Sequence, residues 1–456
     1  MKNRLNPAVL AAGAFACAAL AGASVAVAQS ATFVQVNVDA LGQNIPGDAA
    51  NEPSLAVDPT NPLRMAIGWR QFDTINSSFR QAGVAHTTDG GLTWTAGTLT
   101  PGQFRSDPVL RSDADGTFYY SSLSSVTSVE VFKSTDGGAT WAPPASAFGG
   151  DKQWIAIDKT NGPGRGNVYQ HWNVQFSAVD DTSFTRSTDG GASFDFPTAG
   201  PVPFSKWGQL AVGPSGTVYS AGSTLDQSGH LFAKSTNAQF ADQTPTFTSK
   251  FVNLGGETPF GNADVNPEGL LGQTNVQAAA NGNLYILQSV DPAGPDPLDV
   301  MFVRSTDDGE TWSAPVRVNA DPAGEDAYQW FGTMSVAPSG RIDAIWNDTG
   351  ADAGDHLSAL TYAYSLDDGQ TWLGHVALTP AFDHTLGYPS QAKMGDYFDM
   401  TSDDAGANVA FAATFTGGQD VYYMRITAVP EPAAVGLMLV GAALAGLRRR
   451  APGQRR

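Results

Sequence analysis

Short segments in which hydrophobic and polar residues alternate make up most of the chain, and turn residues separate them. One recurring segment begins with a polar or aromatic residue and continues with alternating apolar residues, as in residues 52–58 and 151–158. A period of two is typical of half-buried β-strands. The 50 glycines and 28 prolines favour many turns and few long helices. The pattern therefore predicts an all-β protein, with segments that begin near residues 52, 107, 151, 207, 275, 329 and 396.

A second pattern recurs at the ends of other predicted strands: Ser or Thr, an Asp two residues later, Gly, and then Trp or Phe. Asp oxygens can accept backbone N–H groups within such a turn, and Gly adopts a positive φ without steric cost. From Asp89 to Asp136 is 47 residues, and from Asp307 to Asp367 is 60 residues. These spacings fit one four-stranded propeller blade with its loops. Besides a decayed copy at Ser235, good copies occupy residues 87–94, 134–141, 187–194, 305–312 and 365–372.

The seven segment starts predict a β-propeller of seven four-stranded blades, with six blades as the alternative. The last unit, residues 395–426, has room for about three strands and contains no copy of the second pattern. Residues 33–38 alternate well and could supply its missing outer strand. Both chain ends would then share one blade and close the ring without an exposed edge. An insertion near residues 240–272 is rich in Gly, Pro and Asn, and long loops are often functional.

The second pattern resembles the Asp-box, or BNR repeat, and the resemblance covers most of residues 50–427. It implies a β-propeller of the sialidase-like superfamily. In such propellers the boxes lie on the blade periphery, away from the active site. The resemblance therefore implies a structural role for the five box aspartates, which are Asp89, Asp136, Asp189, Asp307 and Asp367.

Residues 1–28 are predicted to be a secretory signal peptide. Lys2 and Arg4 give a positive start, an Ala-rich apolar stretch follows, and Ala26-Val27-Ala28 forms an A-x-A cleavage pattern. A first transmembrane helix is the less favoured alternative, because small residues dominate the segment. Cys17 is the one cysteine and lies in this segment, so we expect the mature chain to contain no disulfide.

Residues 429–456 form a second predicted targeting segment, and residues 29–428 are then the propeller domain. Pro430-Glu431-Pro432 precedes an apolar run at residues 433–447 and three arginines at residues 448–450. The run is shorter than the roughly 20 residues of a stable membrane span. The arrangement resembles the PEP-CTERM sorting signal of Gram-negative bacteria. The resemblance implies exosortase processing, delivery to the cell envelope, outer surface or extracellular matrix, and membrane contact only through this segment before processing. An ordinary tail anchor is the alternative.

Composition and charge exclude several other classes of protein. The formal net charge of −19 argues against nucleic acid as a partner, because phosphate binding needs a basic surface. The 42% hydrophobic and 10% aromatic content excludes wholesale disorder. The mature chain has no cysteine nucleophile, no G-x-S-x-G elbow and no H-E-x-x-H motif. We predict no cofactor.

Candidate functional residues lie at the heads of the recurring segments, because the first strand of each propeller blade lines the central channel. Acids and amides can hydrogen-bond sugar hydroxyls and flat rings can stack on sugar faces, although these groups could equally bond one another and channel waters. Asp107 and Asp151 could also help to bind calcium through their oxygens. The catalytic candidates are Glu52, Asp107, Asp151, Asp396, Tyr397 and Arg70. The substrate-binding candidates are Gln153, Trp154, Trp207, Gln209 and Trp330.

The resemblance to sialidases implies a chemistry with three arginines that clamp a carboxylate, a tyrosine nucleophile paired with a glutamate, and an aspartate acid/base. Tyr397 next to Asp396 matches the nucleophile in type, with Glu52 as its partner. The Phe/Tyr-Arg-Ile-Pro element of sialidases is absent, however, and the arginines follow no triad pattern. Seven blades also depart from the six of sialidases. Whether the chain is an enzyme therefore stays open.

Three functions remain, in order of preference. The first is an exported, envelope- or matrix-associated propeller that binds a glycan or exopolysaccharide at the channel mouth. The second is a glycoside hydrolase, exo-α-sialidase-like, or a lyase with a divergent active site. The third is a protein–protein scaffold in the envelope. Each expects the exosortase and the secretion machinery as partners during export.

Overall fold

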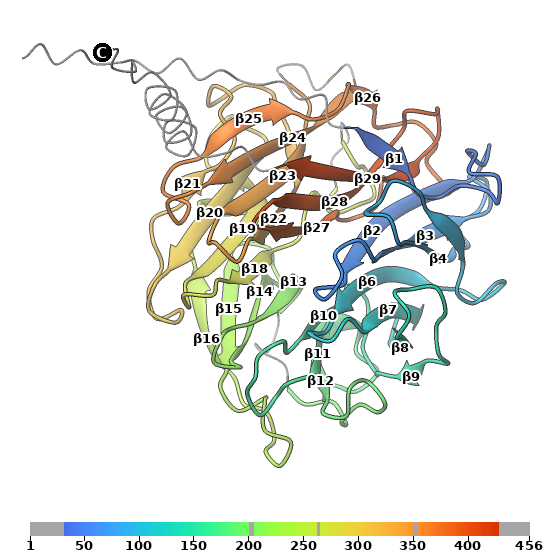
Figure 1. Cartoon of the computed structure of the whole chain (residues 1–456). Helices are drawn as coiled ribbons and strands as arrows, with labels where there is room; N and C mark the ends of the chain where they lie inside the picture. Colours follow the sequence, from blue (N-terminus) through green and yellow to red (C-terminus); the bar gives the residue numbers. More distant parts are fainter. Residues whose placement is uncertain (1–31, 200–204, 262–264, 351–353, 355, 428–456) are drawn as a thin grey trace, which may run out of the picture.

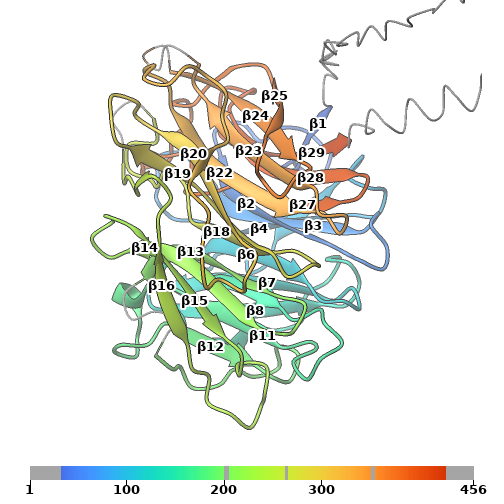
Figure 2. The same cartoon turned by 90° about the vertical axis from the view of Figure 1, so that its left-hand side faces the viewer.

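The computed structural model describes residues 32–199, 205–261, 265–350, 354 and 356–427. These residues form seven small antiparallel sheets arranged like blades around one axis (Figures 1 and 2). The predicted all-β propeller with seven blades is confirmed, and the six-bladed alternative is wrong. The predicted signal peptide and the predicted sorting tail lie outside the described residues. Within the described part of the chain, no helix is long and apolar enough to cross a membrane.

The blades are numbered in chain order, and each extends from an inner strand near the axis to an outer strand at the rim. Blade one consists of β2 (Ala49–Val57), β3 (Met65–Phe72), β4 (Gln81–Thr87) and β5 (Thr95–Thr98). Blade two consists of β6 (Ser106–Ser112), β7 (Phe118–Ser125), β8 (Ser128–Ser134) and β9 (Ala145–Ser146). Blade three consists of β10 (Trp154–Ile157), β11 (Val168–His171) and β12 (Phe184–Ser187). Blade four consists of β13 (Ser205–Val212), β14 (Val218–Thr224), β15 (His230–Ser235) and β16 (Thr248–Val252). Blade five consists of β17 (Gly256–Glu257), β18 (Asn275–Ala278), β19 (Leu284–Pro292), β20 (Asp299–Ser305) and β21 (Val316–Arg317). Blade six consists of β22 (Gln329–Val336), β23 (Ile342–Asp348), β24 (Leu357–Ser365), β25 (Leu373–Ala377) and β26 (Phe382–Asp383). Blade seven consists of β27 (Asp399–Asp403), β28 (Gly406–Ala413) and β29 (Asp420–Thr427), together with β1 (Phe33–Gln35). A 3-10 turn, η1 (Val174–Phe176), follows β11.

Each blade packs both of its faces against neighbouring blades. Successive side chains of a strand point to opposite faces of its sheet. On β3, Ile67 joins a cluster with Ala410 of blade seven, whereas its neighbour Ala66 joins a cluster with Leu110 and Tyr120 of blade two. The strands near the axis are therefore buried on both faces, and this burial includes polar residues such as Glu52 on β2 and Asp107 on β6.

The N-terminal strand closes the ring as predicted. β1 pairs with β29, and Phe33 lies opposite Met424. The contact continues beyond the strand, where the Asn37 side chain donates to Asp420 Oδ1 at 2.8 Å. Blade seven thus takes three strands from the C-terminal end of the described chain and one from its N-terminal end (Figure 1).

The five copies of the second sequence pattern form one recurring turn, here called the repeat turn, between the third strand of a blade and the segment that follows it. In blade two, Asp136 Oδ1 accepts from Ser134 Oγ at 2.8 Å and from the Thr140 N–H at 2.9 Å. Gly138 has φ +90°, and a Cβ there would lie 2.8 Å from the Ala66 side chain of blade one. The repeat turns lie at the ends of the blades opposite the inner-strand heads, because the last residue of β4, Thr87, pairs with the first residue of β3.

Three blades depart from the regular four-strand plan. In blade six, both β25 and β26 pair with β24. The sheet of blade three has three strands, and the position of its fourth strand is reduced to a bridge between Phe184 and Thr198. In blade five, both β17 and β18 pair with β19. The predicted insertion at residues 240–272 contains β16 and β17, so part of it is regular structure. Residues 266–270 of the insertion contact blade seven, as described below.

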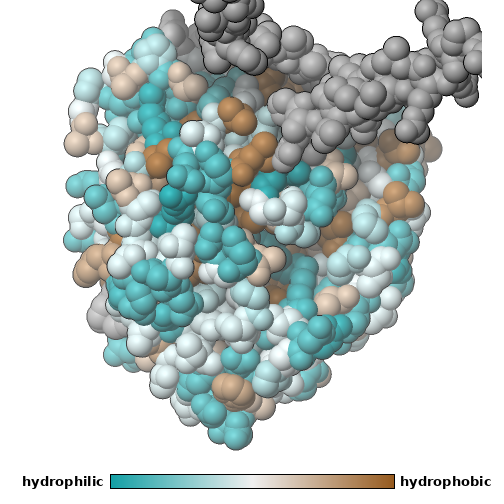
Figure 3. All heavy atoms as spheres, turned by 60° about the vertical axis from the view of Figure 1, so that its left-hand side comes forward, coloured by the Kyte–Doolittle hydropathy of each residue, from teal (hydrophilic) through white to brown (hydrophobic). Residues whose placement is uncertain are grey.

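The molecular surface agrees with the acidic composition. On the face shown in Figure 3, hydrophilic side chains predominate and hydrophobic ones form small, separate groups. The propeller therefore offers no broad apolar face in that view.

Candidate functional site at the channel mouth

The heads of the inner strands share an uncommon backbone conformation. Glu52, Asp107, Lys152, Trp207 and Phe331 all have positive φ values, between 51° and 62°. The strand pairing shifts register beside four of them, in β2, β6, β13 and β22, as it does at a β-bulge. Such residues store about 1–3 kcal/mol of strain each and cluster at functional sites, and bulges re-aim side chains. The sequence therefore places strained polar and aromatic residues together at one end of the channel.

A cavity of about 330 Å³ lies among these heads. Segments of blades one to five and of blade seven contribute to its wall, so it lies at the mouth of the central channel. Its volume falls at the lower end of the range for small-ligand sites, about 300–1,000 Å³. We call it the mouth pocket; it is lined by Arg70, Arg80, Asp107, Asp151, Lys152, Asn173, Gln175, Phe176, Trp207, Phe260, Glu268, Leu270, Gln391, Lys393 and Asp396.

A network of ion pairs joins four blades at the mouth pocket, and Lys393 links it to blade one, with its Nζ 3.7 Å from Glu52 Oε1. Lys152 Nζ lies 2.7 Å from Asp107 Oδ2 and 2.6 Å from Asp396 Oδ2. Lys393 Nζ also lies 2.6 Å from Asp396 Oδ2. Arg70 Nε lies 3.2 Å from Glu52 Oε2, and both side chains are almost fully buried. Because Lys152 pairs with acids of two other blades, its ion pairs form only in the closed ring.

The network separates the acids into two classes by their pKa values. Burial alone would raise the pKa of Asp107, but Lys152 and Arg70 hold it well below its usual value. The same balance of burial against Lys152 and Lys393 holds the pKa of Asp396 well below its usual value. Burial raises the pKa of Glu52 to about 7 and also raises the pKa of Asp151. Carboxyls with divergent pKa values in one cavity are the arrangement that acid–base chemistry needs.

The last part of the predicted insertion bridges the mouth and anchors to blade seven. The Leu270 N–H donates to Asp396 Oδ1 at 2.8 Å. The Asn266 side chain donates to the Gly395 carbonyl at 2.8 Å and accepts from the Met394 N–H at 2.7 Å. The same insertion contains Phe260, whose ring stacks on the Trp207 ring with 5.6 Å between the two centroids. Phe260 is 56% exposed, so the bridge presents an aromatic surface at the rim of the pocket.

The structure brings five of the eleven sequence candidates into the lining of the mouth pocket, and Glu52 lies behind Arg70. Tyr397 is buried and donates from its hydroxyl to the Pro108 carbonyl at 2.8 Å, and burial raises its pKa well above the usual value. Trp330 is buried and donates to Ser358 Oγ at 3.2 Å. The candidates outside the lining are Glu52, Gln153, Trp154, Gln209, Trp330 and Tyr397, and all of them are buried.

Sequence reasoning missed several residues of the pocket. Lys152 lies within a recurring segment, but its sequence position does not reveal its ion-pair partners, because these are acids of other blades. Arg80 and Lys393 lie in loops that show no recurrence. Phe260 lies in the predicted insertion, whose composition signalled an unusual loop but no particular residue. Only the closed ring brings these side chains together.

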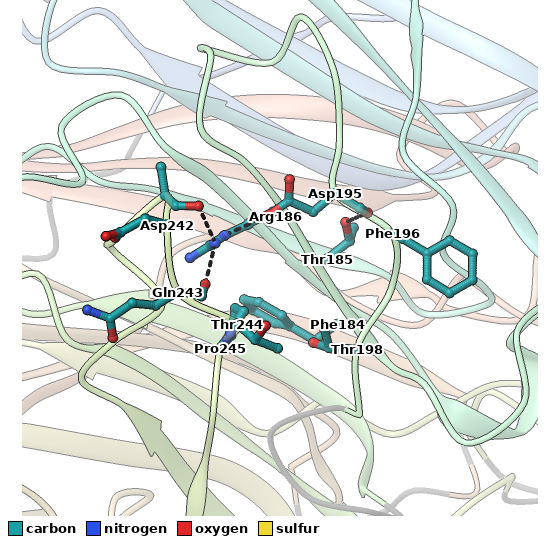
Figure 4. Close-up of a pocket in the computed structure, with 11 residues that line it drawn as sticks. Phe184, Thr185, Arg186, Asp195, Phe196, Thr198, Asp242, Gln243, Thr244 and Pro245 are labelled. Carbon is teal, nitrogen blue, oxygen red and sulfur yellow. Dashed lines mark hydrogen bonds and ion pairs between the residues drawn. The ribbon is translucent and has the colours of Figure 1, made fainter.

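A second cavity, of about 300 Å³, lies away from the channel between blades three and four (Figure 4). Arg186 extends into it and pairs with Asp195 Oδ2 at 2.9 Å. The other guanidinium N–H groups donate to backbone carbonyls, including those of Ala238 at 2.6 Å and Gln243 at 2.6 Å. Because its donors are already satisfied, Arg186 fastens the decayed repeat of blade four to blade three and offers little to a ligand.

One acidic triad in blade five could hold a metal ion by its spacing. Oxygen atoms of Asp296, Asp299 and Asp321 lie within 4.8 Å of one another. Arg317 already lies among them, with its Nε 2.5 Å from Asp299 and its Nη2 2.6 Å from Asp321. The guanidinium therefore brings a positive charge to the triad, while Asp296 Oδ1 is buried without a hydrogen-bond partner among the described residues. At the mouth, the carboxylate of Asp107 likewise faces Lys152.

No family model matches the chain. The chain is 29% identical over 324 residues to a xyloglucanase of a Paenibacillus species. The match covers 62% of this chain and 28% of that relative, so the chain spans less than a third of the relative's length.

Several solved structures share the fold at low sequence identity. An ulvan lyase structure has a TM-score of 0.49 and 11% identity, covering 87% of this chain and 96% of that one. A protein of unknown function from Dyadobacter fermentans has a TM-score of 0.45 and 13% identity, with coverages of 87% and 98%. A Hadza microbial sialidase has a TM-score of 0.41 and 15% identity, with coverages of 83% and 66%. At these identities the similarity concerns the fold alone.

Proposed function

We propose that the chain is a glycan-binding propeller of the Asp-box, sialidase-like kind and that the mouth pocket is its binding site. The observation that carries the proposal is the exposed ring of Phe260, which stacks on the buried Trp207, beside a wall of carboxylates, amides and cations. Aromatic faces stack on the apolar faces of sugars, while the polar wall offers donors and acceptors to hydroxyls. The sequence relative named as a xyloglucanase supports a glycan ligand.

A glycan array with the purified full chain tests this proposal, followed by affinity measurements on the best ligand. Phe260→Ala should weaken binding by about three- to tenfold, because an aromatic contact is worth about 0.5–1.5 kcal/mol. Phe196→Ala is the matched control, since Phe196 is 68% exposed but lies at the second cavity, and it should leave affinity unchanged. A folded protein that binds no glycan on the array would refute the proposal.

Glycan cleavage at the same pocket is the second candidate function. Asp151 favours it, because this carboxyl lines the pocket with a raised pKa while Asp107 nearby has a lowered one. A protonated carboxyl beside an ionised one can act as a general acid toward a glycosidic oxygen. The test measures the release of reducing ends from any glycan that binds. Asp151→Asn should abolish turnover and preserve binding, and turnover that survives this substitution would exclude the assignment.

We also propose that the chain is exported and delivered to the envelope or extracellular matrix after exosortase processing. The support is the sequence of residues 1–28 and 429–456, which combine a cleavage pattern with the Pro430-Glu431-Pro432 motif, an apolar run and arginines. Replacing the three motif residues with alanine should leave the protein in the membrane fraction. A matched triple alanine substitution at residues 453–455, beyond the arginine cluster, should not. Unchanged delivery of the motif variant would contradict exosortase sorting.

A further inference from the structure

A third cavity lies where the ring closes, between the N-terminal segment at residues 37–48 and blade one. Its volume is about 390 Å³, and residues of β3 and β5 complete its wall. We call it the seam pocket. Asp39, Asp48 and Asp73 line it, and no Lys, Arg or His among the described residues does. The seam pocket therefore has the volume of a small-ligand site and charged groups of one sign only.

Two buried acids at this seam have no cationic partner. Asp48 is 5% exposed and lines both the seam pocket and an adjoining cavity of about 160 Å³. Asp420 is 1% exposed and lines the adjoining cavity. Neither of them, nor Asp39 nor Asp73, forms an ion pair within 4.0 Å with a described residue. The acids of the mouth network, by contrast, pair with lysines. The seam thus contains negative charge that the described side chains do not neutralise.

The neutral neighbours of Asp48 use their donors within the protein. Gln71 Nε2 donates to Asp48 Oδ2 at 2.8 Å, and Trp69 Nε1 donates to Gln71 Oε1 at 2.7 Å. Asn37 lies close to both buried acids and directs its Nδ2 to Asp420 Oδ1 at 2.8 Å. Asp48 Oδ1 accepts no well-aligned hydrogen bond from a described residue. Burial raises the pKa of Asp48 to about 6, as expected for a carboxyl without a counter-ion. The buried carboxylate therefore keeps one oxygen for a ligand.

The wall of the seam pocket suits an organic cation better than a metal ion. Among the described residues, oxygens of three acids lie within 4.8 Å of one another at the triad of blade five, and the seam acids form no such group. A primary ammonium donates three hydrogen bonds and accepts none, so it matches a wall whose open polar atoms are acceptors. Its bonds to carboxylates are also stronger than bonds between neutral groups. Asp39 and Asp73 are exposed, so they meet a cation at the outer part of the same wall.

We propose that the seam pocket binds a small molecule through a protonated primary amine, which forms an ion pair with Asp48. Asp39 and Asp73 attract the cation and accept from its remaining donors. The inference does not depend on glycan binding at the mouth pocket. Two kinds of molecule supply this chemistry, an amino sugar and a polyamine, and the experiment separates them.

Two matched pairs of ligands test the proposal by calorimetry with the full chain at pH 7. One pair is the glucosamine trisaccharide and its N-acetylated form, and the other is spermidine and its triacetylated form. Acetylation removes the charge of the amine. We expect the amine of at least one pair to bind at least about tenfold more tightly than its acetylated form at low salt, and high salt to reduce the difference. A preference in the first pair identifies an amino sugar, and a preference in the second identifies a polyamine.

A substitution of the buried acid then locates the binding. Asp48→Asn should remove the preference, because the amide keeps the shape of the side chain and loses its charge. Asp115→Asn is the matched control, since Asp115 is an exposed acid that pairs with Arg165 at 2.7 Å. The two substitutions change the net charge of the chain by the same amount. The control should therefore bind the amine as tightly as the wild-type protein does.

Thr98→Lys tests the same pocket without altering an acid. Thr98 and Trp69 both pair with Gly83, so they lie on one face of blade one, and both line the seam pocket. A lysine at this position places a tethered ammonium at the wall and should exclude the free amine. Equal binding of each amine and its acetylated form would overturn the inference. A preference that survives either Asp48→Asn or Thr98→Lys, in a variant whose melting curve shows that it is folded, would overturn it as well.

Discussion

The aspartates of the repeat turns and those of the mouth pocket are the same residue type in opposite situations. In the turns, each carboxylate accepts hydrogen bonds from neutral groups a few residues away, as Asp307 does from Ser305, Thr311 and the Thr311 N–H. These bonds lower the pKa of Asp307 to about 2, although its side chain is exposed. At the mouth, Asp107 and Asp396 are buried and pair with Lys152 of another blade, and Asp396 also pairs with the nearby Lys393.

The difference shows which aspartates have freedom to act on a ligand. A turn carboxylate is satisfied by its own sequence neighbours, so it recurs wherever the pattern recurs and has a structural role. Asp107 and Asp396 share Lys152 of a third blade, and this shared pairing forms only in the closed ring. Lys152 also lies 3.7 Å from Asp151, whose pKa is raised. We therefore expect function at carboxyl groups whose ion-pair partners are distant in sequence and do not fully compensate the cost of burying the charge.

Removing the central cation of the mouth should have the largest effect. Lys152→Met leaves Asp107 and Asp396 buried without their shared partner, although Lys393 still pairs with Asp396. Breaking a buried ion pair from one side costs about 3–5 kcal/mol. We expect a loss of that size in the free energy of unfolding, measured by urea denaturation at pH 7.

The matched substitution at the rim is Asp136→Ala in the repeat turn of blade two. It removes the hydrogen bonds from Ser134 and Thr140 and should cost about 1 kcal/mol, because exposed groups regain water. If Lys152→Met reduced the free energy of unfolding no more than Asp136→Ala does, the mouth network would contribute no more to stability than the hydrogen bonds of one repeat turn. The comparison between the two regions would then fail.

Acid should act on the two regions in separate pH windows. Burial lowers the pKa of His171 and of His230, both at the mouth ends of their blades, from 6.5 to about 4. The folded state therefore favours the neutral imidazoles, and their cost to stability should develop as the pH falls from 6.5 to 4. The turn carboxylates Asp89 and Asp307 have pKa values lowered to about 2, so their contribution should disappear only below 3.8.

Unfolding free energies measured from pH 7 to pH 2 can separate these windows by difference. The double variant His171→Gln/His230→Gln should lose less stability than the wild-type protein between pH 6.5 and 4. The double variant Asp89→Asn/Asp307→Asn should converge with the wild-type protein only below pH 3.8. Parallel curves for the histidine variant and the wild-type protein across the upper window would show that the two imidazoles are not held neutral.

The fold could be predicted from the sequence because its information is local and repeated. Alternation gave the strands, the repeat turns gave the blade spacing, and the unpaired residues 33–38 indicated how the ring closes. Blade three was less predictable, because its outer strand is replaced by a single bridge at Thr198 while its repeat turn is intact. A regular turn does not guarantee a regular strand after it.

The site could be predicted only in part, for a physical reason. The strand heads identified Asp107, Asp151 and Trp207 as pocket residues, because position on an inner strand is a local property. Which acids would be ionised could not be predicted, since this depends on Lys152 contacting Asp107 and Asp396 of two other blades. Trp154 and Tyr397 show the converse: both lie near strand heads, yet their rings pack against each other at 5.3 Å inside the core.

The smallest expected effect is a change in stability at pH 8 that has opposite signs for the same substitution at the mouth and at the rim. A difference of sign separates the two regions more clearly than a difference of size. Asp151→Asn removes a charge that burial and the nearby Asp107 and Asp396 disfavour, so its pKa is raised and the charged form costs stability once the pH exceeds that pKa. We expect a small gain in melting temperature at pH 8 that disappears at acid pH. Asp89→Asn, the same substitution at the rim, should instead lose stability at pH 8, because the pKa of Asp89 is lowered to about 2. Opposite signs would show that the mouth keeps a carboxyl at a cost to stability, as a site for ligand chemistry does. Equal signs would mean that Asp151 is as well satisfied as a turn aspartate and would remove the reason to assign it a proton-transfer role.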